Sequence, residues 1–312
     1  MRVLVTGGFG YIGGRLAQAL SLQSDYEIIL GSRKNNIALD CLPSIKVIQT
    51  KWDSLNTINT VTHGVDAIVH MAGMNAKDCA ADPVAALEVN GVSTGHLLRS
   101  AINNGVKRFV YLSTAHVYGA TLAGIINENS CPRATHPYAT SHRAGEDMVI
   151  AAHLRGVIEG VVIRLSNSYG PPVNKEVNCW TLLINDLCGQ AVGGKRMVLR
   201  TSGLQRRDFI TLTDVCRAID HLLKLSAAKL GNGVFNVGGK WSPTILDIAK
   251  LTAERVFLLT GEQPEIVTST RGHNKGVQKL EYQISKLIET GYDLSSNINN
   301  EIDSVIEFCL RA

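Results

Sequence analysis

The sequence predicts an α/β protein built on a doubly wound parallel sheet, with a smaller α/β region at the C-terminal end. A short β-branched run at residues 2–5 is followed at once by closely spaced glycines. Further short apolar runs alternate with stretches of helical periodicity, which is the pattern of βαβ units. After the double proline Pro171-Pro172 the runs become shorter. We therefore expect a first region at residues 1–171 and a second at 172–312, with later segments free to return to the first.

The glycine-rich turn that follows the first predicted strand organises the rest of the chain. We expect Gly7 to allow a tight bend, Gly10 to leave room for a pyrophosphate, and Gly13 to let the helix pack close to its strand. The N-terminus of that helix offers free N–H groups and a partial positive charge. The pattern predicts a Rossmann-type dinucleotide site; the alternative is a turn with no ligand. The turn residues expected at the dinucleotide are Gly7, Gly8, Phe9, Gly10, Tyr11, Ile12 and Gly13.

The end of the second predicted strand, residues 26–30, indicates which dinucleotide is preferred. A unit that binds NAD would carry an acidic residue there for the ribose 2′-hydroxyl. This chain has Ser32, Arg33 and Lys34 instead. Because a guanidinium can hold a 2′-phosphate with two hydrogen bonds, Arg33 predicts a preference for NADP(H), assisted by Ser32 and Lys34. The alternative is a solvated basic turn.

Composition limits the other classes of function. The chain of 312 residues has 45% hydrophobic residues, a formal net charge of +4 and no long Lys/Arg run, so we expect no nucleic-acid partner. No apolar run approaches the roughly 20 residues of a membrane span. Because the first predicted strand begins at residue 2, we expect no signal peptide. The 7 cysteines are scattered without a Cys-x-x-Cys pair, so we expect free thiols, no metal and a cytoplasmic location.

The remaining elements follow from apolar periodicity. Predicted strands of the first region cover residues 26–30, 45–48, 67–70, 109–112 and 157–164. A helix is expected at 83–103, and Pro137 opens another as a first-turn proline after the irregular stretch 120–136. In the second region, short helices are expected at about 177–189, 213–228, 244–260, 284–289 and 298–309.

Several motifs stand in one order along the chain. They are Thr6-Gly7-Gly8-x-Gly10-x-x-Gly13, His70-x-Ala72-Gly73, Asn90, Ser113-Thr114 with Val117-Tyr118-Gly119, Tyr138 with a basic residue four positions later, Arg164 with Asn167-x-Tyr169-Gly170-Pro171, Arg207-Asp208-Phe209, and Asn236-Val237-Gly238. This ordered set resembles the extended short-chain dehydrogenase/reductase family. Its best-known members are nucleotide-sugar epimerases, dehydratases and 4-keto reductases. The resemblance covers essentially the whole chain and does not select one member.

The resemblance implies a mechanism. Tyr138 would exchange a proton with a sugar hydroxyl or ketone while hydride moves between that carbon and the nicotinamide. Thr114 would hydrogen-bond the substrate oxygen, with Ser113 as the fallback. Since free tyrosine has a pKa of about 10, something must lower it for work as a base near neutral pH.

The sequence departs from the family four residues after the tyrosine, where His142 replaces the usual lysine. The family lysine holds the nicotinamide ribose and lowers the tyrosine pKa. Histidine titrates near 6.5 and reaches less far. Arg143, one residue on, points about 100° around the helix and is a poor substitute. Three accounts stay open: His142 works, by holding the ribose hydroxyls and protonating on demand; another cation takes over; or the site binds ligand without turnover.

Other roles are implied by the same resemblance. Asp53 would contact adenine; Ala72, Gly73 and Asn90 would line the cofactor; Asn167 would contact the substrate diphosphate or sugar, Arg207 would grip the diphosphate, Arg271 would be a second clamp, and His116 would touch substrate. For Arg207 the alternative is an ion pair with Asp208 or Asp214, and for His116 it is a structural histidine.

Three functions are compatible with these residues. The first is NADPH-dependent reduction of a 4-keto sugar linked to a nucleotide diphosphate, favoured by Arg33. The second is an NAD-dependent nucleotide-sugar 4-epimerase. The third is a catalytically impaired cofactor- or sugar-nucleotide-binding protein, suggested by His142. The family also implies a homodimer formed through helix 83–103 and the Tyr138 helix.

Overall fold

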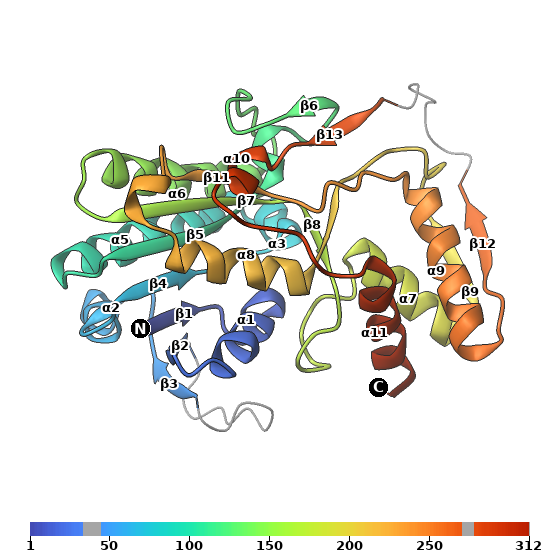
Figure 1. The fold of residues 1–312 in the computed structure, drawn as a ribbon, viewed down its shortest axis with the longest axis horizontal. Coiled ribbons are helices and arrows are strands. Elements are labelled where there is room, and N and C mark those ends of the chain that lie inside the picture. The colour runs from blue at the N-terminus through green and yellow to red at the C-terminus, as the bar shows by residue number, and fades with distance from the viewer. Residues whose placement is uncertain (34–44, 270–277, 312) are drawn as a thin grey trace.

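The computed structural model describes residues 1–33, 45–269 and 278–311. Its centre is a seven-stranded sheet in the order β11-β7-β5-β4-β1-β2-β3, with every neighbouring pair parallel (Figure 1). The strands are β1 (Arg2–Thr6), β2 (Glu27–Ser32), β3 (Lys46–Gln49), β4 (Ala67–His70), β5 (Arg108–Thr114), β7 (Glu159–Leu165) and β11 (Val234–Val237). The predicted α/β fold is confirmed, and β11 brings the chain beyond residue 171 back to this sheet.

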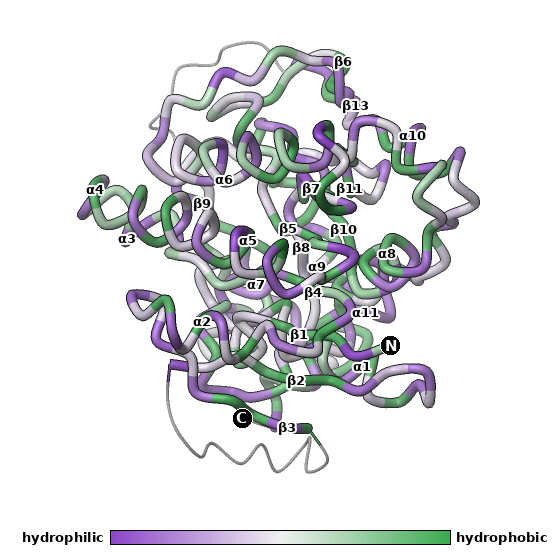
Figure 2. Tube along the Cα trace, turned by 90° about the vertical axis from the view of Figure 1, so that its left-hand side faces the viewer, coloured by the Kyte–Doolittle hydropathy of each residue, from purple (hydrophilic) through white to green (hydrophobic). Residues whose placement is uncertain are grey.

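Helices cover both faces of the sheet because successive strand residues point to opposite sides. Val3 and Val5 pack with α1 (Tyr11–Ser21) and α8 (Leu212–Lys224), whereas Leu4 packs on the other side. That second face carries α2 (Leu55–Thr62), α5 (Ser93–Asn103) and α6 (Pro137–Leu154). The hydrophobic residues of the central strands lie between these two helix layers (Figure 2).

The helix expected at residues 83–103 is not uniform. It consists of α4 (Pro83–Ala86), a π-helical segment η1 (Leu87–Val92) and α5, and a separate α3 (Ala76–Ala81) precedes it. Within η1, the main-chain oxygen of Asn90 accepts a hydrogen bond from the Thr94 hydroxyl at 2.7 Å, and the Tyr111 hydroxyl oxygen lies 3.3 Å from it. A side chain thus satisfies a carbonyl in a segment whose ladder departs from the α-helical pattern.

The second lobe has its own core. It contains α7 (Leu183–Gly194), α9 (Ile245–Thr260) and α11 (Ile298–Arg311), with β9 (Arg196–Leu199) paired to β12 (Glu265–Thr268). The lobe lies on the side of the large sheet where its parallel strands have their carboxyl ends (Figure 1). The remaining smaller elements are β6 (Gly124–Ile126), β8 (Asn167–Tyr169), β10 (Phe209–Thr211), β13 (Leu280–Tyr282), α10 (Ser285–Glu289), and the short helices η2 (Ala115–Tyr118) and η3 (Ala227–Lys229).

Three expected helix boundaries in the C-terminal half are wrong. The helix expected at 177–189 begins at Leu183, after a turn in which the Leu182 N–H bonds the Cys179 oxygen. It also continues through Gly193 and Gly194, ending only where Lys195 adopts a left-handed conformation with φ 51°. The helix expected at 213–228 ends earlier, at Lys224.

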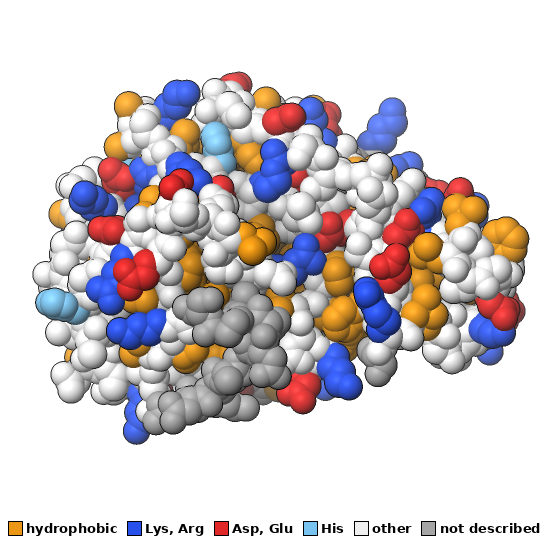
Figure 3. Space-filling model, turned by 60° about the horizontal axis from the view of Figure 1, so that its bottom comes forward, with side chains coloured by type: hydrophobic (Ala, Val, Ile, Leu, Met, Phe, Trp, Pro, Cys, Tyr) orange, Lys and Arg blue, Asp and Glu red, His pale blue; other side chains and the backbone are white. Residues whose placement is uncertain are grey.

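In the described residues, no helix is long and apolar enough to cross a membrane. On the face drawn in Figure 3, Lys and Arg side chains alternate with Asp and Glu and with hydrophobic side chains. Among the described residues drawn there, charges of one sign form no separate patch.

Candidate active site

The glycine turn lies at the carboxyl end of β1, beside the end of β4. Gly7 has φ +71°, and a Cβ there would come within 2.9 Å of the Ala72 nitrogen. A Cβ on Gly13 would overlap the main chain of Gly7, which explains why the helix can approach the strand only with glycine at this position. No side chain caps the N-terminus of α1 at Gly10. This close-packed main-chain cradle fits a dinucleotide phosphate group.

The residues expected around the adenosine end lie past β2 and β3. Ser32 is buried at the end of β2, and Arg33 is exposed immediately after it, with its carbonyl accepting from the Gln49 side chain at 3.3 Å. Lys34 lies outside the described residues. Asp53 is exposed past β3. Arg33 is therefore exposed at the same edge of the sheet as the glycine turn.

The loop after β4 is held by side chains from two other elements. The Met71 and Ala72 N–H groups both donate to Thr6 Oγ1 at 3.1 Å. The Met74 N–H donates to Asn90 Oδ1 at 2.8 Å, and a Cβ on Gly73 would lie 2.9 Å from the same oxygen. The Asn90 amide nitrogen donates to Ser141 Oγ at 2.9 Å. Asn90 thus ties the Ala72–Gly73 loop to α6, and its side-chain polar atoms are engaged within the protein.

Tyr138 and His142 share one face of α6, as their spacing requires. Their ring centroids are 4.5 Å apart and the rings meet edge to face. Burial raises the pKa of Tyr138 to about 12, although the neighbouring Thr114 hydroxyl acts to lower it. Burial lowers the pKa of His142 to about 4. At neutral pH the pair is therefore a phenol beside an uncharged imidazole.

The cations near α6 are engaged elsewhere. Arg143 pairs with Glu146 at 3.2 Å and with Asp147, in agreement with its expected direction away from the tyrosine. Arg164 is buried against Glu146 at 2.8 Å and donates to the Tyr118 hydroxyl at 2.9 Å. In the part of the chain that the structure describes, no lysine or arginine influences the pKa of Tyr138 or His142.

Sequence reasoning missed Tyr111, whose hydroxyl lies 3.0 Å from His142 Nδ1. Tyr111 reads as a core residue of β5, and its ring is indeed 1% exposed. The available signal was its position two residues before Ser113, because alternate residues of a strand share a face. Ser113 is buried too, and within the described residues its hydroxyl has no hydrogen-bond partner.

A cavity of about 240 Å³, here called the Thr114 cavity, brings together the substrate residues expected from sequence. Thr114, His116, Asn167 and Arg207 all line it. The other lining residues are Ala115, Ala120, Thr121, Leu122, Leu165, Ser166, Gln205, Arg206, Asp208 and Leu280. Arg271 lies outside the described residues. Gln205 and Arg206 were missed because nothing in their spacing distinguishes them from a solvated loop.

Arg207 and Asp208 of the Thr114 cavity differ in whether other groups of the protein already bind their charged atoms. Among the described residues no carboxylate pairs with Arg207, since Asp214 pairs with Arg217 at 2.9 Å and the two Asp208 oxygens accept from the Gly239 and Trp241 N–H groups at 3.0 and 3.1 Å. Burial raises the pKa of Asp208 to about 7. Burial and the charge of Arg207 lower the pKa of His116. The cavity thus presents a free guanidinium beside a largely neutral histidine.

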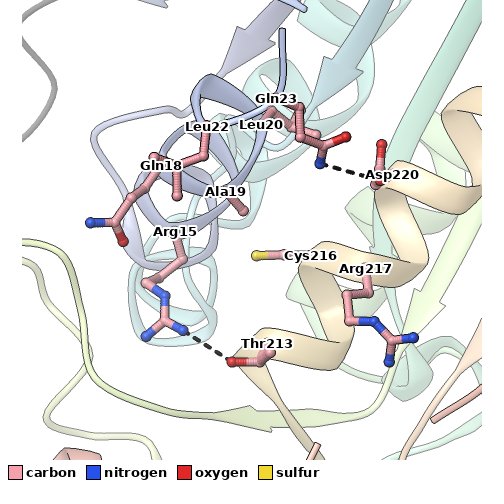
Figure 4. Close-up of a pocket in the computed structure, with 10 residues that line it drawn as sticks. All are labelled: Arg15, Gln18, Ala19, Leu20, Leu22, Gln23, Thr213, Cys216, Arg217 and Asp220. Carbon is pink, nitrogen blue, oxygen red and sulfur yellow. Dashed lines mark hydrogen bonds between the residues drawn. The ribbon is translucent and has the colours of Figure 1, made fainter. Parts of the chain in front are cut away.

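A second cavity, of about 230 Å³, lies between α1 and α8 and contains none of the expected site residues. Arg15 donates to the Thr213 hydroxyl across it and Gln23 donates to Asp220, while Cys216 points toward α1 (Figure 4). The hydrogen bonds of Arg15 and Gln23 across this cavity join the two helices. We therefore place the candidate site at the carboxyl edge of the sheet.

Comparison with known proteins agrees with this geometry. The model of the NAD dependent epimerase/dehydratase family matches residues 3–238. The chain belongs to this family. Relatives within it include a dTDP-glucose 4,6-dehydratase of Streptomyces niveus, 29% identical over 80% of this chain and 76% of that protein. A dTDP-D-glucose 4,6-dehydratase of Mus musculus is 30% identical over 80% of this chain and 71% of its own.

Solved structures share the fold at lower identity. UDP-glucose 4-epimerase from Thermotoga maritima superposes with a TM-score of 0.84 at 21% identity, covering 100% of this chain and 99% of that one. RMD from Pseudomonas aeruginosa, complexed with NADPH, gives 0.81 at 21% identity with the same coverage. The expected family is confirmed: the chain is an NAD(P)-dependent enzyme of the nucleotide-sugar epimerase, dehydratase and reductase type.

Proposed function

We propose that this family member is an NADP(H)-dependent reductase of a 4-keto sugar linked to a nucleotide diphosphate. The observation that carries the proposal is the pairing of Tyr138 with an uncharged His142. The bound reduced nicotinamide would supply hydride to the carbonyl carbon. Tyr138 would donate its phenolic proton to the carbonyl oxygen, and Thr114 would hold that oxygen.

Reduction of a ketone and oxidation of a hydroxyl require opposite protonation states of Tyr138. Reduction of a ketone starts from the phenol, which dominates at neutral pH when the pKa is about 12. Epimerisation and dehydration begin by oxidising a hydroxyl and need the phenolate, which a raised pKa of Tyr138 disfavours at neutral pH. A fixed cation beside the tyrosine would reverse this preference, and position 142 provides none.

In the described part of the Thr114 cavity, no carboxylate is free to assist dehydration. Expulsion of a hydroxyl needs a further acid–base group near the sugar. The carboxylate that lines the described part of the cavity is Asp208, and both of its oxygens are engaged by main-chain N–H groups. Arg207 supplies a free guanidinium suited to a diphosphate, with Asn167 close by.

The cofactor preference rests on the edge of the sheet at β2. Gly7, Gly10 and Gly13 would hold the pyrophosphate, as their close main-chain packing allows. Arg33 would clamp the 2′-phosphate of NADP(H), with Ser32 beside it. Consumption of reduced cofactor accords with this choice.

A homodimer is part of the same proposal. Large apolar side chains are exposed along the segment that leads into α5 and at the end of α6. They are Val84, Leu87, Val89, Val92 and Leu154. Pairing of this helical face with a second copy would bury them. Light scattering at micromolar concentration should give twice the mass of 33.7 kDa.

Titration of the cofactor-stripped protein with NADPH and NADH, followed by nicotinamide fluorescence, tests the proposal first. A clear preference for NADPH supports it and leads to a panel of 4-keto nucleotide sugars, with NADPH oxidation as the readout. Preference for NADH, or NAD that resists removal, would instead favour a 4-epimerase. Absence of binding by either cofactor would favour an impaired binding protein.

A further inference from the structure

Two buried histidines, His70 and His142, are held by two sets of hydrogen bonds that meet at the main-chain oxygen of Asn90. His70 at the end of β4 contacts Thr6 Oγ1 through Nδ1 at 2.6 Å and Thr94 Oγ1 through Nε2 at 3.0 Å. Thr94 donates to the Asn90 carbonyl at 2.7 Å, and the Tyr111 hydroxyl lies 3.3 Å from the same oxygen. Tyr111 in turn reaches Nδ1 of His142 at 3.0 Å.

The positions of the protons around His70 follow from the donors there. Thr6 Oγ1 accepts the Met71 and Ala72 N–H groups, so its own proton goes to His70 Nδ1. His70 must then carry its proton on Nε2, where it donates to Thr94 Oγ1. That bond leaves the Thr94 proton for the Asn90 carbonyl. Both nitrogens of His70 are used, and its role is structural.

Around His142, the described hydrogen bonds leave one ring nitrogen free. The single proton of Tyr111 has two acceptors, but the Asn90 carbonyl at 3.3 Å is beyond the usual O–H···O range and already accepts from Thr94. His142 Nδ1 at 3.0 Å is the better acceptor. In the described residues nothing hydrogen-bonds Nε2 of His142. The adjacent ring atom, Cε1, faces Gly73 in the loop after β4 and lies 3.7 Å from where its Cβ would be.

We propose that Tyr111 is a positioning residue that fixes His142 as the neutral tautomer protonated on Nε2, with this N–H presented to the cofactor ribose. The ligand named here rests on the proposed function; the tautomer does not. The imidazole would keep the hydrogen-bond donor that a lysine supplies at this position and dispense with its charge. No proton is transferred in this arrangement.

The local packing holds Tyr111 in place. A Cβ on Gly145 would lie 2.6 Å from the Tyr111 hydroxyl oxygen and 2.9 Å from the Asn90 oxygen, so α6 can rest on this hydroxyl only because residue 145 is glycine. His142 is 7% exposed, and its ring is bounded by Tyr111 and Tyr138. Rotation of the ring would break the bond to Tyr111.

Nitrogen-15 NMR of the histidine-labelled protein, without cofactor, tests the tautomer directly. The His142 signals are identified by their loss in His142→Gln. We expect one protonated nitrogen, Nε2, and an unprotonated Nδ1, the same pattern as His70. In Tyr111→Phe the His142 pattern should change to a mixture of tautomers while that of His70 persists. Protonation on Nδ1 in the natural protein, or an unchanged pattern in Tyr111→Phe, would overturn the proposal.

NADPH affinity gives a second readout from two matched variants. The amide nitrogen of glutamine can replace Nε2, and that of asparagine can replace Nδ1. We expect His142→Gln to bind NADPH within about threefold of the natural protein and His142→Asn to bind about tenfold more weakly. Tyr111→Phe should weaken binding about threefold to tenfold.

Tyr292→Phe is the control for loss of a buried hydroxyl, because Tyr292 donates to the Asp214 carbonyl at 2.9 Å, away from the site. It should leave NADPH affinity unchanged. Retained affinity in His142→Asn with loss in His142→Gln would contradict the proposal even if Tyr111→Phe failed to fold. If no NADP(H) binds at all, the proposed function fails, and the NMR pattern still decides the role of Tyr111.

Discussion

The two sides of the candidate site differ in what shapes them: main chain at the β1 turn and side chains at α6. At the β1 turn the shape is made by main chain, where Gly7 has φ +71° and a Cβ on Gly13 would overlap Gly7. On α6 the properties are made by side chains from other elements, since Tyr111 of β5 holds His142 and Thr114 adjoins Tyr138. Gly7 and Gly13 therefore leave no space for a side chain. Position 142 of α6, in contrast, can hold a histidine in place of a lysine, and this replacement changes the charge beside Tyr138.

The largest effect is expected on the side-chain part of the site. Tyr138→Phe removes the proton donor and should lower 4-keto-sugar reduction about 10³-fold. NADPH affinity should stay within about twofold, because the ring and its contact with His142 remain. Stopped-flow or steady-state oxidation of NADPH measures the first quantity and fluorescence titration the second. Equal loss of both would show that the phenol serves binding rather than proton transfer.

The main-chain part of the site is tested by two neighbouring glycines. Gly13→Ala should destabilise the protein by about 1–3 kcal/mol and abolish cofactor binding, because its Cβ has no space beside Gly7. Gly14→Ala is the matched control: its nearest atoms lie at 3.5 Å, and alanine favours the helix by roughly 0.5–1 kcal/mol. Urea unfolding compares the two. Similar stability in both variants would contradict the close packing described for the turn.

Between these extremes lies Arg33, a side chain at the edge of the main-chain region. Arg33→Ala should weaken NADPH binding about tenfold to a hundredfold, the value of a lost charged hydrogen bond to phosphate. NADH lacks the 2′-phosphate, so its affinity should not change. Fluorescence titration with both cofactors gives the comparison. Parallel losses for NADPH and NADH would remove the basis for the NADP(H) preference.

The smallest effect concerns pH. With pKa values of about 4 for His142 and about 12 for Tyr138, neither group titrates between about pH 5.5 and 8, so their contribution to the reduction rate should be flat there. His142→Lys adds a cation beside the phenol and should lower the pH midpoint of alcohol oxidation with NADP⁺ by about 1–3 units. A midpoint that does not move would show that residue 142 does not act on Tyr138.

This contrast also explains what could be predicted from sequence. Glycine spacing reports main-chain constraints, and the alternation of strands and helices indicated the parallel sheet. The residues expected at the substrate, Thr114, His116, Asn167 and Arg207, were found from their places at strand ends or in motifs, and they line one cavity. The spacing of Tyr138 and His142 gave their contact. Their protonation could not be predicted, because it depends on burial and on Tyr111, which is 31 residues from His142 in sequence.

The ends of helix α7 also could not be predicted from local sequence patterns. The start of α7 at Leu183 depends on a turn around Cys179, and its end depends on the left-handed conformation of Lys195, a residue type that does not mark such a position. The π segment at Asn90 arises among contacts from Thr94 and Tyr111, one of them from a different layer of the fold.

Helix α1, which begins at the glycine turn, is hydrogen-bonded to the segment that leads into the second lobe. Tyr11 donates to the Gly170 carbonyl at 2.9 Å, Asn185 of α7 donates to the same oxygen at 3.0 Å, and Arg15 donates to the Pro171 carbonyl at 3.0 Å. A rotation of the lobe about the double proline must either break these bonds or drag the turn along with it. These bonds therefore join the turn that would hold the cofactor phosphates to the segment that leads into the second lobe.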